Sequence, residues 1–262
     1  MTAAAVLPPL LALIIFAPAW AVTGFVGLCT AWGLYEVAGM APGGSAVSAL
    51  ALLAGGAAAV IGLGRLAPAA SAALAAAAVA AMCALLLKVA WSGAQALPRG
   101  LLPGLGALYV GALFPYFALL RNQQAGVPLL LLMMAAVIAG DSGAFFAGRA
   151  IGRIKLIPAV SPGKTVEGAL AYLACGIAAA CALKTPLGVN WNMETAAGFG
   201  MLVSVVAQLG DLAESAFKRV AGVKDSGWLF PGHGGLLDRT DSLVFAAFFA
   251  YYYSRWLGFA SA

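Results

Sequence analysis

The chain has 262 residues, of which 63% are hydrophobic and only 9% are charged, and its mean hydropathy is +0.99. Soluble domains are typically about 45–50% apolar, so this composition excludes an ordinary soluble protein. The net charge of +5 is small, and the placement of the charges along the chain matters more than their sum. We expect no nucleic-acid partner.

Long apolar runs predict an all-α fold, a polytopic integral membrane helix bundle with about nine transmembrane helices. Runs of about 20 residues can cross a bilayer, and lipid-exposed backbone has to satisfy its hydrogen bonds internally. Because these runs are continuous rather than alternating, they favour helices over a β-barrel. The predicted spans cover residues 6–19, 20–39, 45–64, 69–90, 101–120, 127–147, 161–183, 194–220 and 238–256.

We expect these spans to form a single transmembrane domain, residues 1–262. Scaffold helices fill 1–126, and catalytic helices with cytoplasmic loops fill 127–262. The first span is short for a full crossing, and Glu36 closes the second.

A polar loop over 148–163 separates two of the spans. The sequence Ser-Pro-Gly-Lys-Thr at 161–165 predicts a helix start, because Ser161 supplies a capping hydroxyl and Pro162 suits a first turn.

The basic residues predict the orientation of the bundle, because cytoplasmic loops carry an excess of Lys and Arg. The order of the spans places one group on the side that we assign as cytoplasmic: Lys88, Arg99, Arg149, Arg153, Lys155, Lys164, Lys218, Arg219, Lys224 and Arg239. A smaller group falls on the other side: Arg65, Arg121, Lys184 and Arg255.

Residues 215–241, SAFKRVAGVKDSGWLFPGHGGLLDRTD, collect charge between two apolar runs. Asp211, Glu214, Ser215 and Lys218 follow one another at spacings of three and four, which places them along one helix face. Charge at this density is not expected from packing alone.

Three further acids fall in the late spans: Asp238 and Asp241, three residues apart on one face, and Asp141 in an earlier span. A charged residue at the middle of the bilayer costs about 2.5–3.5 kcal/mol. The acids therefore have to face a polar cavity, a cation or one another.

This combination predicts phosphoryl transfer. Hard carboxylate oxygens suit Mg²⁺, which completes its shell with water and substrate phosphates. The Pro-Gly-His-Gly-Gly turn at 231–235 leads into the last helix, where glycine N–H groups and the helix N-terminus favour an anion. A metal ion beside a basic, glycine-rich loop is typical of sites that catalyse phosphoryl transfer.

The same residues also allow simpler interpretations. Asp211–Lys218 and Asp238–Arg239 could be interfacial ion pairs that only anchor helix ends. His233 could be a loop residue that forms ordinary hydrogen bonds. Arg149, Arg153 and Lys155 could serve only to set the topology and contact lipid headgroups.

The stretch resembles the signature of the phosphatidate cytidylyltransferase (CDP-diacylglycerol synthase) family. The shared positions are Ser215, Lys218-Arg219, Lys224-Asp225, Pro231 to Gly235, and Asp238-Arg239-Thr240-Asp241. Similarity extends to Asp141 through Arg153, Ser161-Pro162, Lys164 through Gly168, and Gln208 through Asp211, whereas the N-terminal helices match only in hydropathy. Gly163 departs from the pattern, since many members carry a second lysine there.

The resemblance implies a nucleotidyltransferase of phospholipid biosynthesis that transfers the cytidylyl group of CTP to phosphatidate. It implies Mg²⁺, with K⁺ as a candidate second cation, held by Asp211, Asp238 and Asp241, with Asp141 as a further candidate. The implied catalytic residues are Asp211, Lys218, Arg219, Asp238, Arg239 and Asp241. The implied substrate-binding residues are Ser161, Lys164, Ser215, Lys224, His233, Gly234 and Gly235.

The resemblance also implies a homodimer in the bacterial cytoplasmic (inner) membrane, with the active site on the cytoplasmic side. Two alternatives stay open. One is another CTP-dependent lipid-phosphate transferase or kinase, and the other is an ion-coupled transporter that uses the same intramembrane acids.

Overall fold

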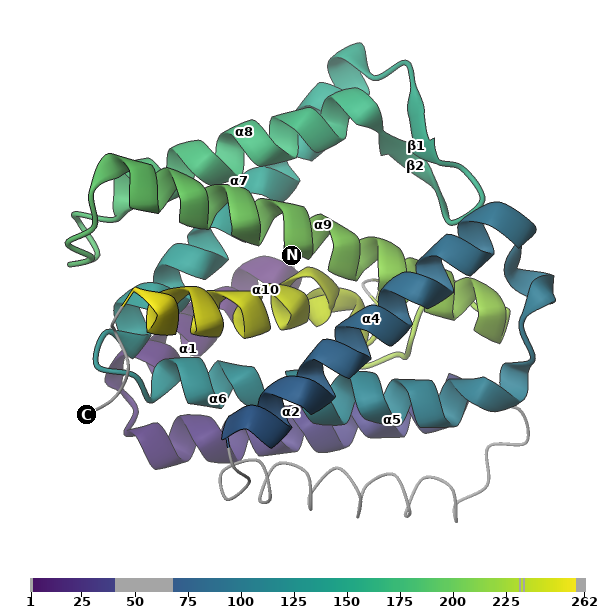
Figure 1. Ribbon diagram of the computed structural model, residues 1–262, viewed down its shortest axis with the longest axis horizontal. Helices are drawn as coiled ribbons and strands as arrows, with labels where there is room; N and C mark the ends of the chain where they lie inside the picture. The colour runs from purple at the N-terminus through teal and green to yellow at the C-terminus, as the bar shows by residue number, and fades with distance from the viewer. Residues whose placement is uncertain (1, 41–67, 231, 233, 258–262) are drawn as a thin grey trace. The chain divides into compact units, whose positions relative to one another are not determined.

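The computed structural model describes residues 2–40, 68–230, 232 and 234–257 (Figure 1). This part of the chain is almost entirely helical, which confirms the predicted all-α class. Its elements are α1 Thr2–Phe16, α2 Ala19–Met40, α4 Pro68–Ser92, η1 Ala94–Ala96, η2 Arg99–Leu101, α5 Leu102–Leu113, α6 Pro115–Arg121, α7 Gly126–Ile151, β1 Lys155–Ile157, β2 Ser161–Thr165, α8 Val166–Leu183, α9 Met193–Ala221 and α10 Leu237–Trp256.

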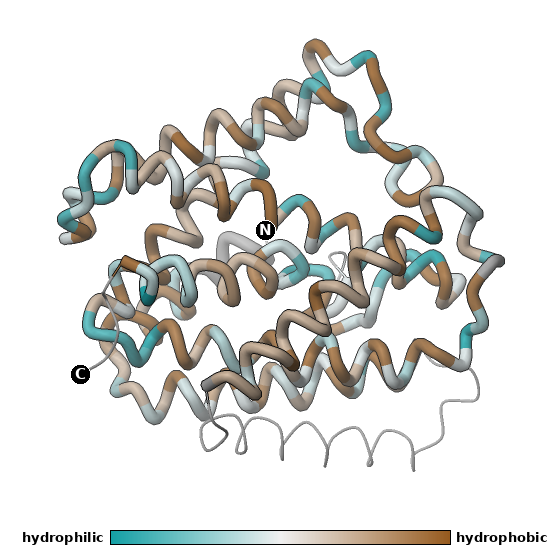
Figure 2. The backbone as a smooth tube through the Cα atoms, viewed as in Figure 1, coloured by the Kyte–Doolittle hydropathy of each residue, from teal (hydrophilic) through white to brown (hydrophobic). Residues whose placement is uncertain are grey.

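Among the described residues, 6 helical segments are long and apolar enough to cross a membrane: Ala19–Met40, Ala69–Ser92, Arg99–Arg121, Gly126–Ile151, Val166–Leu183 and Met193–Ala221. Each corresponds to a predicted span. Hydrophobic residues dominate these helices, and hydrophilic ones gather at the hairpin and near the helix ends (Figure 2). The chain is therefore a polytopic helical membrane protein.

The count of nine spans stays a prediction. Residues 45–64 lie outside the described residues, and α1 is 15 residues long. The last helix, α10, has 20 residues but includes Asp238, Arg239, Asp241 and Arg255.

The predicted span 101–120 is divided into η2, α5 and α6. Phe114 separates α5 from α6 but keeps helical φ and ψ angles of −54° and −39°. Pro115 follows it and has no N–H group, so it interrupts the helical hydrogen bonds without ending the span.

The predicted helix start at Ser161 is wrong, because residues 161–165 form β2. This strand pairs antiparallel with β1, with Lys155 opposite Thr165 and Ile157 opposite Ser161. The helix α8 begins only at Val166, where the Thr165 Oγ1 atom accepts a hydrogen bond of 3.1 Å from the Gly168 N–H. Pairing with β1 satisfies backbone that the local sequence alone would place in a first helical turn.

The chain folds as two compact units, each made of two stretches: residues 1–118 with 213–241, and residues 119–212 with 242–262. In the first unit α2 and α4 pack against α5. Gly106 of α5 lies directly against Val37 of α2, and Gly33 of α2 leaves room for Leu237, the first residue of α10. These small residues allow the helices to approach closely.

In the second unit α7 and α8 pack along each other. Gly140 of α7 faces the Tyr172 ring of α8, and Gly176 of α8 faces Ser204 of α9. Close packing of these three helices holds the β1–β2 hairpin and α9 at fixed positions around one pocket.

Candidate active site

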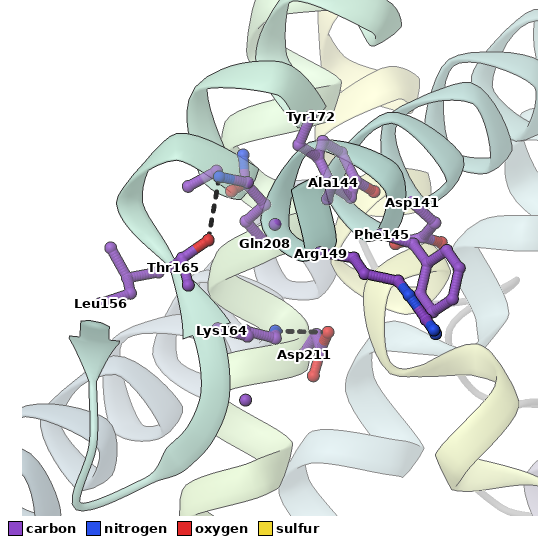
Figure 3. A pocket seen from close by; sticks show the side chains of 14 residues that line it. Asp141, Ala144, Phe145, Arg149, Leu156, Lys164, Thr165, Tyr172, Gln208 and Asp211 are labelled. Carbon is purple, nitrogen blue, oxygen red and sulfur yellow. Dashed lines mark hydrogen bonds and ion pairs between the residues drawn. The ribbon is translucent and has the colours of Figure 1, made fainter. Parts of the chain in front are cut away.

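A pocket of about 440 Å³ opens in the second unit between α7, the hairpin, α8 and α9 (Figure 3). Its walls are partly apolar, and its polar lining comprises Asp141, Arg149, Lys164, Thr165, Tyr172, Gln208 and Asp211. We call it the Asp211 pocket. A mainly apolar cleft with a few converging charged groups is the usual form of a small-molecule site.

Lys164 of β2 and Asp211 of α9 form an ion pair inside this pocket (Figure 3). Their side chains stay 29% and 27% exposed, so water reaches both groups. An exposed ion pair contributes only about 0–1 kcal/mol to stability. The pair can therefore separate at little cost, which makes the ammonium available to a phosphate and the carboxylate available to a cation.

Thr165 holds the hairpin beside the pocket, because it fits against three glycines. A Cβ atom placed on Gly148, Gly152 or Gly168 would lie 3.3, 2.8 or 3.1 Å from the Thr165 Oγ1 atom. Thr165 thereby fixes the neighbouring Lys164 relative to α7 and α8.

A second group of polar residues lies in the first unit, around the Glu36 carboxylate of α2. Glu36 is only 3% exposed. Its Oε1 atom accepts hydrogen bonds from Trp32 Nε1 at 2.9 Å and from the Leu236 N–H at 2.7 Å. Its Oε2 atom accepts from Ser226 Oγ at 2.8 Å and from the Leu237 N–H at 3.0 Å. Because α10 begins at Leu237, Glu36 caps the N-terminus of that helix from a distant part of the chain.

Asp238, in the first turn of α10, is bound through both of its oxygens. Its Oδ2 atom accepts from the Ser226 N–H at 2.7 Å, from Ser226 Oγ at 2.9 Å and from the Gly235 N–H at 2.8 Å. Its Oδ1 atom accepts from Lys218 Nζ at 2.5 Å. The carboxylate is therefore held in one orientation.

Lys218 joins Asp238 to a third acid, Glu214. The ammonium lies 3.3 Å from Glu214 Oε1, and the Glu214 side chain is 1% exposed. Tyr109 donates its hydroxyl to Glu214 Oε2 at 3.3 Å. We call this connected set the Glu36 network: Trp32, Glu36, Tyr109, Glu214, Lys218, Ser226, Gly235 and Asp238.

The glycine-rich turn before α10 needs its glycines. Gly232 and Gly234 have φ angles of +74° and +82°, a region that side chains rarely adopt. The N–H groups that follow already have partners, since those of Gly235, Leu236 and Leu237 donate to Asp238 and Glu36. The phosphate-binding roles of Gly234 and Gly235 stay predictions. His233 lies outside the described residues, and so does its predicted contact with phosphate.

The remaining predicted site residues lie outside the pocket lining and the hydrogen bonds given above, although Asp241 interacts electrostatically with Lys218, and their roles stay predictions. Ser161, Ser215, Arg219 and Asp241 are partly buried, whereas Lys224 and Arg239 are exposed.

Sequence reasoning missed Glu36 as part of a polar site. Two signals point to it: an acid in an otherwise apolar helix, and the absence of a capping side chain at Leu236, where Ser, Thr, Asp or Asn is preferred. It also treated Arg149 as a possible topology determinant, whereas the structure places this residue in the lining of the Asp211 pocket.

The acids present suit a magnesium ion that is completed by water and substrate. Within the described residues no three His, Cys, Asp or Glu side chains gather closely enough to hold a metal by themselves. Mg²⁺ usually takes only one or two carboxylates and finds its other ligands in water and phosphate. The accessible Asp211 carboxylate fits that chemistry, and the oriented Oδ1 atom of Asp238 would fit it after exchanging its Lys218 partner for the ion.

Comparison with known proteins identifies the family of this chain. The sequence model of the Cytidylyltransferase family matches residues 1–257. The phosphatidate cytidylyltransferase of Brucella suis biovar 1 (strain 1330) is 41% identical over 176 residues, which cover 65% of this chain and 62% of that protein. The enzymes of the same name from Bacillus subtilis (strain 168) and Staphylococcus aureus (strain COL) are each 42% identical, over 153 and 137 residues. Those matches cover 56% and 52% of this chain, and 55% and 52% of the two relatives. The chain thus matches between about half and two thirds of the length of these relatives. On the match across nearly its full length, the chain belongs to the Cytidylyltransferase family.

Proposed function

We propose that this chain transfers the cytidylyl group of CTP to phosphatidate. The observation that carries the proposal is the Asp211 pocket, where Lys164, Arg149 and Asp211 line one cavity in a membrane protein of the Cytidylyltransferase family. Relatives at 41–42% identity bear the name phosphatidate cytidylyltransferase.

In the proposed reaction a phosphate oxygen of phosphatidate forms a bond to the α-phosphorus of CTP. The bond from that phosphorus to the bridging oxygen of the β-phosphate breaks, and CDP-diacylglycerol and pyrophosphate leave. Both reactants are anions, so neutralising and aligning them should provide most of the rate enhancement. Lys164 and Arg149 have the charge and the exposure to bind their phosphates. No covalent intermediate with the protein is needed.

We further propose Asp211, Asp238 and Asp241 as ligands of Mg²⁺, with Asp141, which lines the pocket, as a further candidate. When bound, the ion would neutralise the phosphate oxygens and stabilise the charge that develops on the leaving pyrophosphate. K⁺ is proposed as a second cation.

The setting proposed for this reaction is the bacterial cytoplasmic membrane, with the active site on its cytoplasmic side and a homodimer as the assembly. CTP is dissolved in the cytoplasm and phosphatidate is confined to the leaflet, so the enzyme has to work where the two meet. The distribution of Lys and Arg supports this orientation.

The test uses purified full-length protein in detergent micelles with dispersed phosphatidate and labelled CTP, with and without Mg²⁺. We expect equal amounts of CDP-diacylglycerol and pyrophosphate, and only with Mg²⁺. Transfer of a single phosphate from CTP to a lipid would indicate a kinase instead. Ion flux into liposomes without consumption of CTP would indicate a transporter.

A further inference from the structure

Glu36 lies outside every motif assigned to the reaction, yet it binds both stretches of chain that hold Asp238. Its carboxylate accepts from Ser226, which itself contacts Asp238, and from the first N–H groups of α10, the helix that carries Asp238. Glu36 is about 190 and 200 residues away from these partners in the sequence.

Capping the N-terminus of α10 does not by itself require a carboxylate from a distant helix. A Ser, Thr, Asp or Asn side chain at position 236 would cap α10 locally. The carboxylate of α2 ties the start of α10 to another helix, which a local cap would not do.

The glycines around Glu36 show how closely the chain surrounds it. A Cβ atom on Gly235 would lie 2.5 Å from both Glu36 oxygens and even closer to Ser226 Oγ. A Cβ atom on Gly227 would lie 2.8 Å from Glu36 Oε1. Position 235 therefore has to be glycine to admit Glu36, independently of any contact with phosphate.

This packing sets the orientation of the Asp238 carboxylate. Ser226 Oγ lies 2.8 Å from Glu36 Oε2 and 2.9 Å from Asp238 Oδ2, so its single hydrogen is shared between the two carboxylates. With Oδ2 occupied by Ser226 and Gly235, the other oxygen, Oδ1, is directed toward Lys218. Carboxylates that bind metals are commonly oriented by hydrogen bonds of this kind.

We propose that Glu36 is a positioning residue of the active site. Through Ser226 and the N-terminus of α10 it fixes the orientation in which Asp238 receives the divalent cation. This inference rests on the proposed function, in which Asp238 is a metal ligand. Glu36 does not bind the cation in this proposal, whereas Asp238 exchanges its Lys218 partner on Oδ1 for the cation.

The variant that tests it is Glu36→Gln in the full-length protein, since one of its two acceptor oxygens becomes an NH₂ group. We expect the amides of 235–238 to exchange hydrogen at least about 10-fold faster. We also expect the Mg²⁺ concentration for half-maximal CDP-diacylglycerol synthesis to rise about 10- to 100-fold, the usual effect of losing such a partner. Mn²⁺ binding in the presence of CTP, followed by electron paramagnetic resonance, should weaken by the same factor.

Two further variants keep the test decisive. Ser226→Ala removes only the hydroxyl between the two carboxylates, and it should raise the Mg²⁺ requirement in the same direction by a smaller factor. Glu194→Gln changes an exposed acid in the first turn of α9 and should leave all three measurements at wild-type values.

A purely structural role for Glu36 predicts a different pattern. Glu36→Gln would then reduce the amount of folded enzyme, while the Mg²⁺ requirement and Mn²⁺ affinity of the folded fraction stayed unchanged, and this result would overturn the proposal. If Glu36→Gln does not fold, a wild-type Mg²⁺ requirement in Ser226→Ala overturns it equally. A wild-type protein that makes no CDP-diacylglycerol would instead refute the proposed function.

Discussion

The Asp211 pocket and the Glu36 network both bring acids together with a lysine, but they differ in access to solvent. In the pocket, Lys164 and Asp211 form one pair beside a cavity of about 440 Å³, and each side chain is more than a quarter exposed. In the network, Lys218 is shared by the buried acids Glu214 and Asp238, and further buried donors occupy Glu36. A partly exposed pair exchanges its partner for a ligand easily, whereas a buried set that shares several hydrogen bonds holds its members more firmly.

This difference predicts how each region responds to the loss of a charge. Charges in the network should matter for folding and for the orientation of Asp238. Charges in the pocket should matter for binding and turnover, with little effect on stability.

The largest effect is expected from Lys218→Met. Removing the ammonium leaves Glu214 and Asp238 buried without their shared cation, and breaking a buried ion pair costs about 3–5 kcal/mol. Thermal unfolding in detergent micelles should show this as a large fall in the midpoint. Lys88→Met, which alters an exposed lysine of α4, is the matched control. Equal stability of Lys218→Met and wild type would mean that Lys218 does not hold the network together.

A smaller change in stability but a severe loss of turnover is expected from Asp211→Asn. Removing one preorganised charge from an active site typically lowers kcat by about 100- to 1000-fold. The free energy of unfolding should change by less than about 1 kcal/mol, because the Lys164–Asp211 pair is partly exposed to water. Initial rates with saturating CTP and the unfolding midpoint are the two measurements, and Glu194→Gln is the control. A loss of stability as large as that of Lys218→Met would contradict the comparison.

Some features of the two regions could be predicted from the sequence, and others could not. The bounds of α9 and α10 follow from apolar length, so the predicted 194–220 and 238–256 agree with Met193–Ala221 and Leu237–Trp256. Asp211 and Asp141 could be named as candidate site residues because a charge in an apolar span requires an explanation, whereas Lys164 could be named from the family resemblance.

The network around Glu36 could not be found this way, because its partners are set by tertiary packing. A single acid near the end of a span looks like an interfacial residue until Leu236 and Leu237 are seen to donate to it. The hairpin was missed for a related reason. Ser161 and Pro162 have the local features of a helix start, and only the pairing of β2 with β1, which puts Ser161 opposite Ile157, makes them part of a strand.

The smallest effect is expected from Thr165→Ala, which tests how firmly the wall of the Asp211 pocket is held. Thr165 caps α8 through the Gly168 N–H and fits against Gly148 of α7, so its loss should cost about 1 kcal/mol of stability. Ser161→Ala is the matched comparison, because the sequence predicts that residue as the cap whereas the structure places it in β2. If Ser161→Ala lowered the unfolding midpoint and Thr165→Ala did not, the helix would begin where the sequence suggests. The expected opposite order would show that the hairpin is anchored at Thr165.

Because Lys164 adjoins this anchor, Thr165→Ala should also raise the KM for CTP by a few-fold. A change in kcat alone would mean that the anchor does not position Lys164.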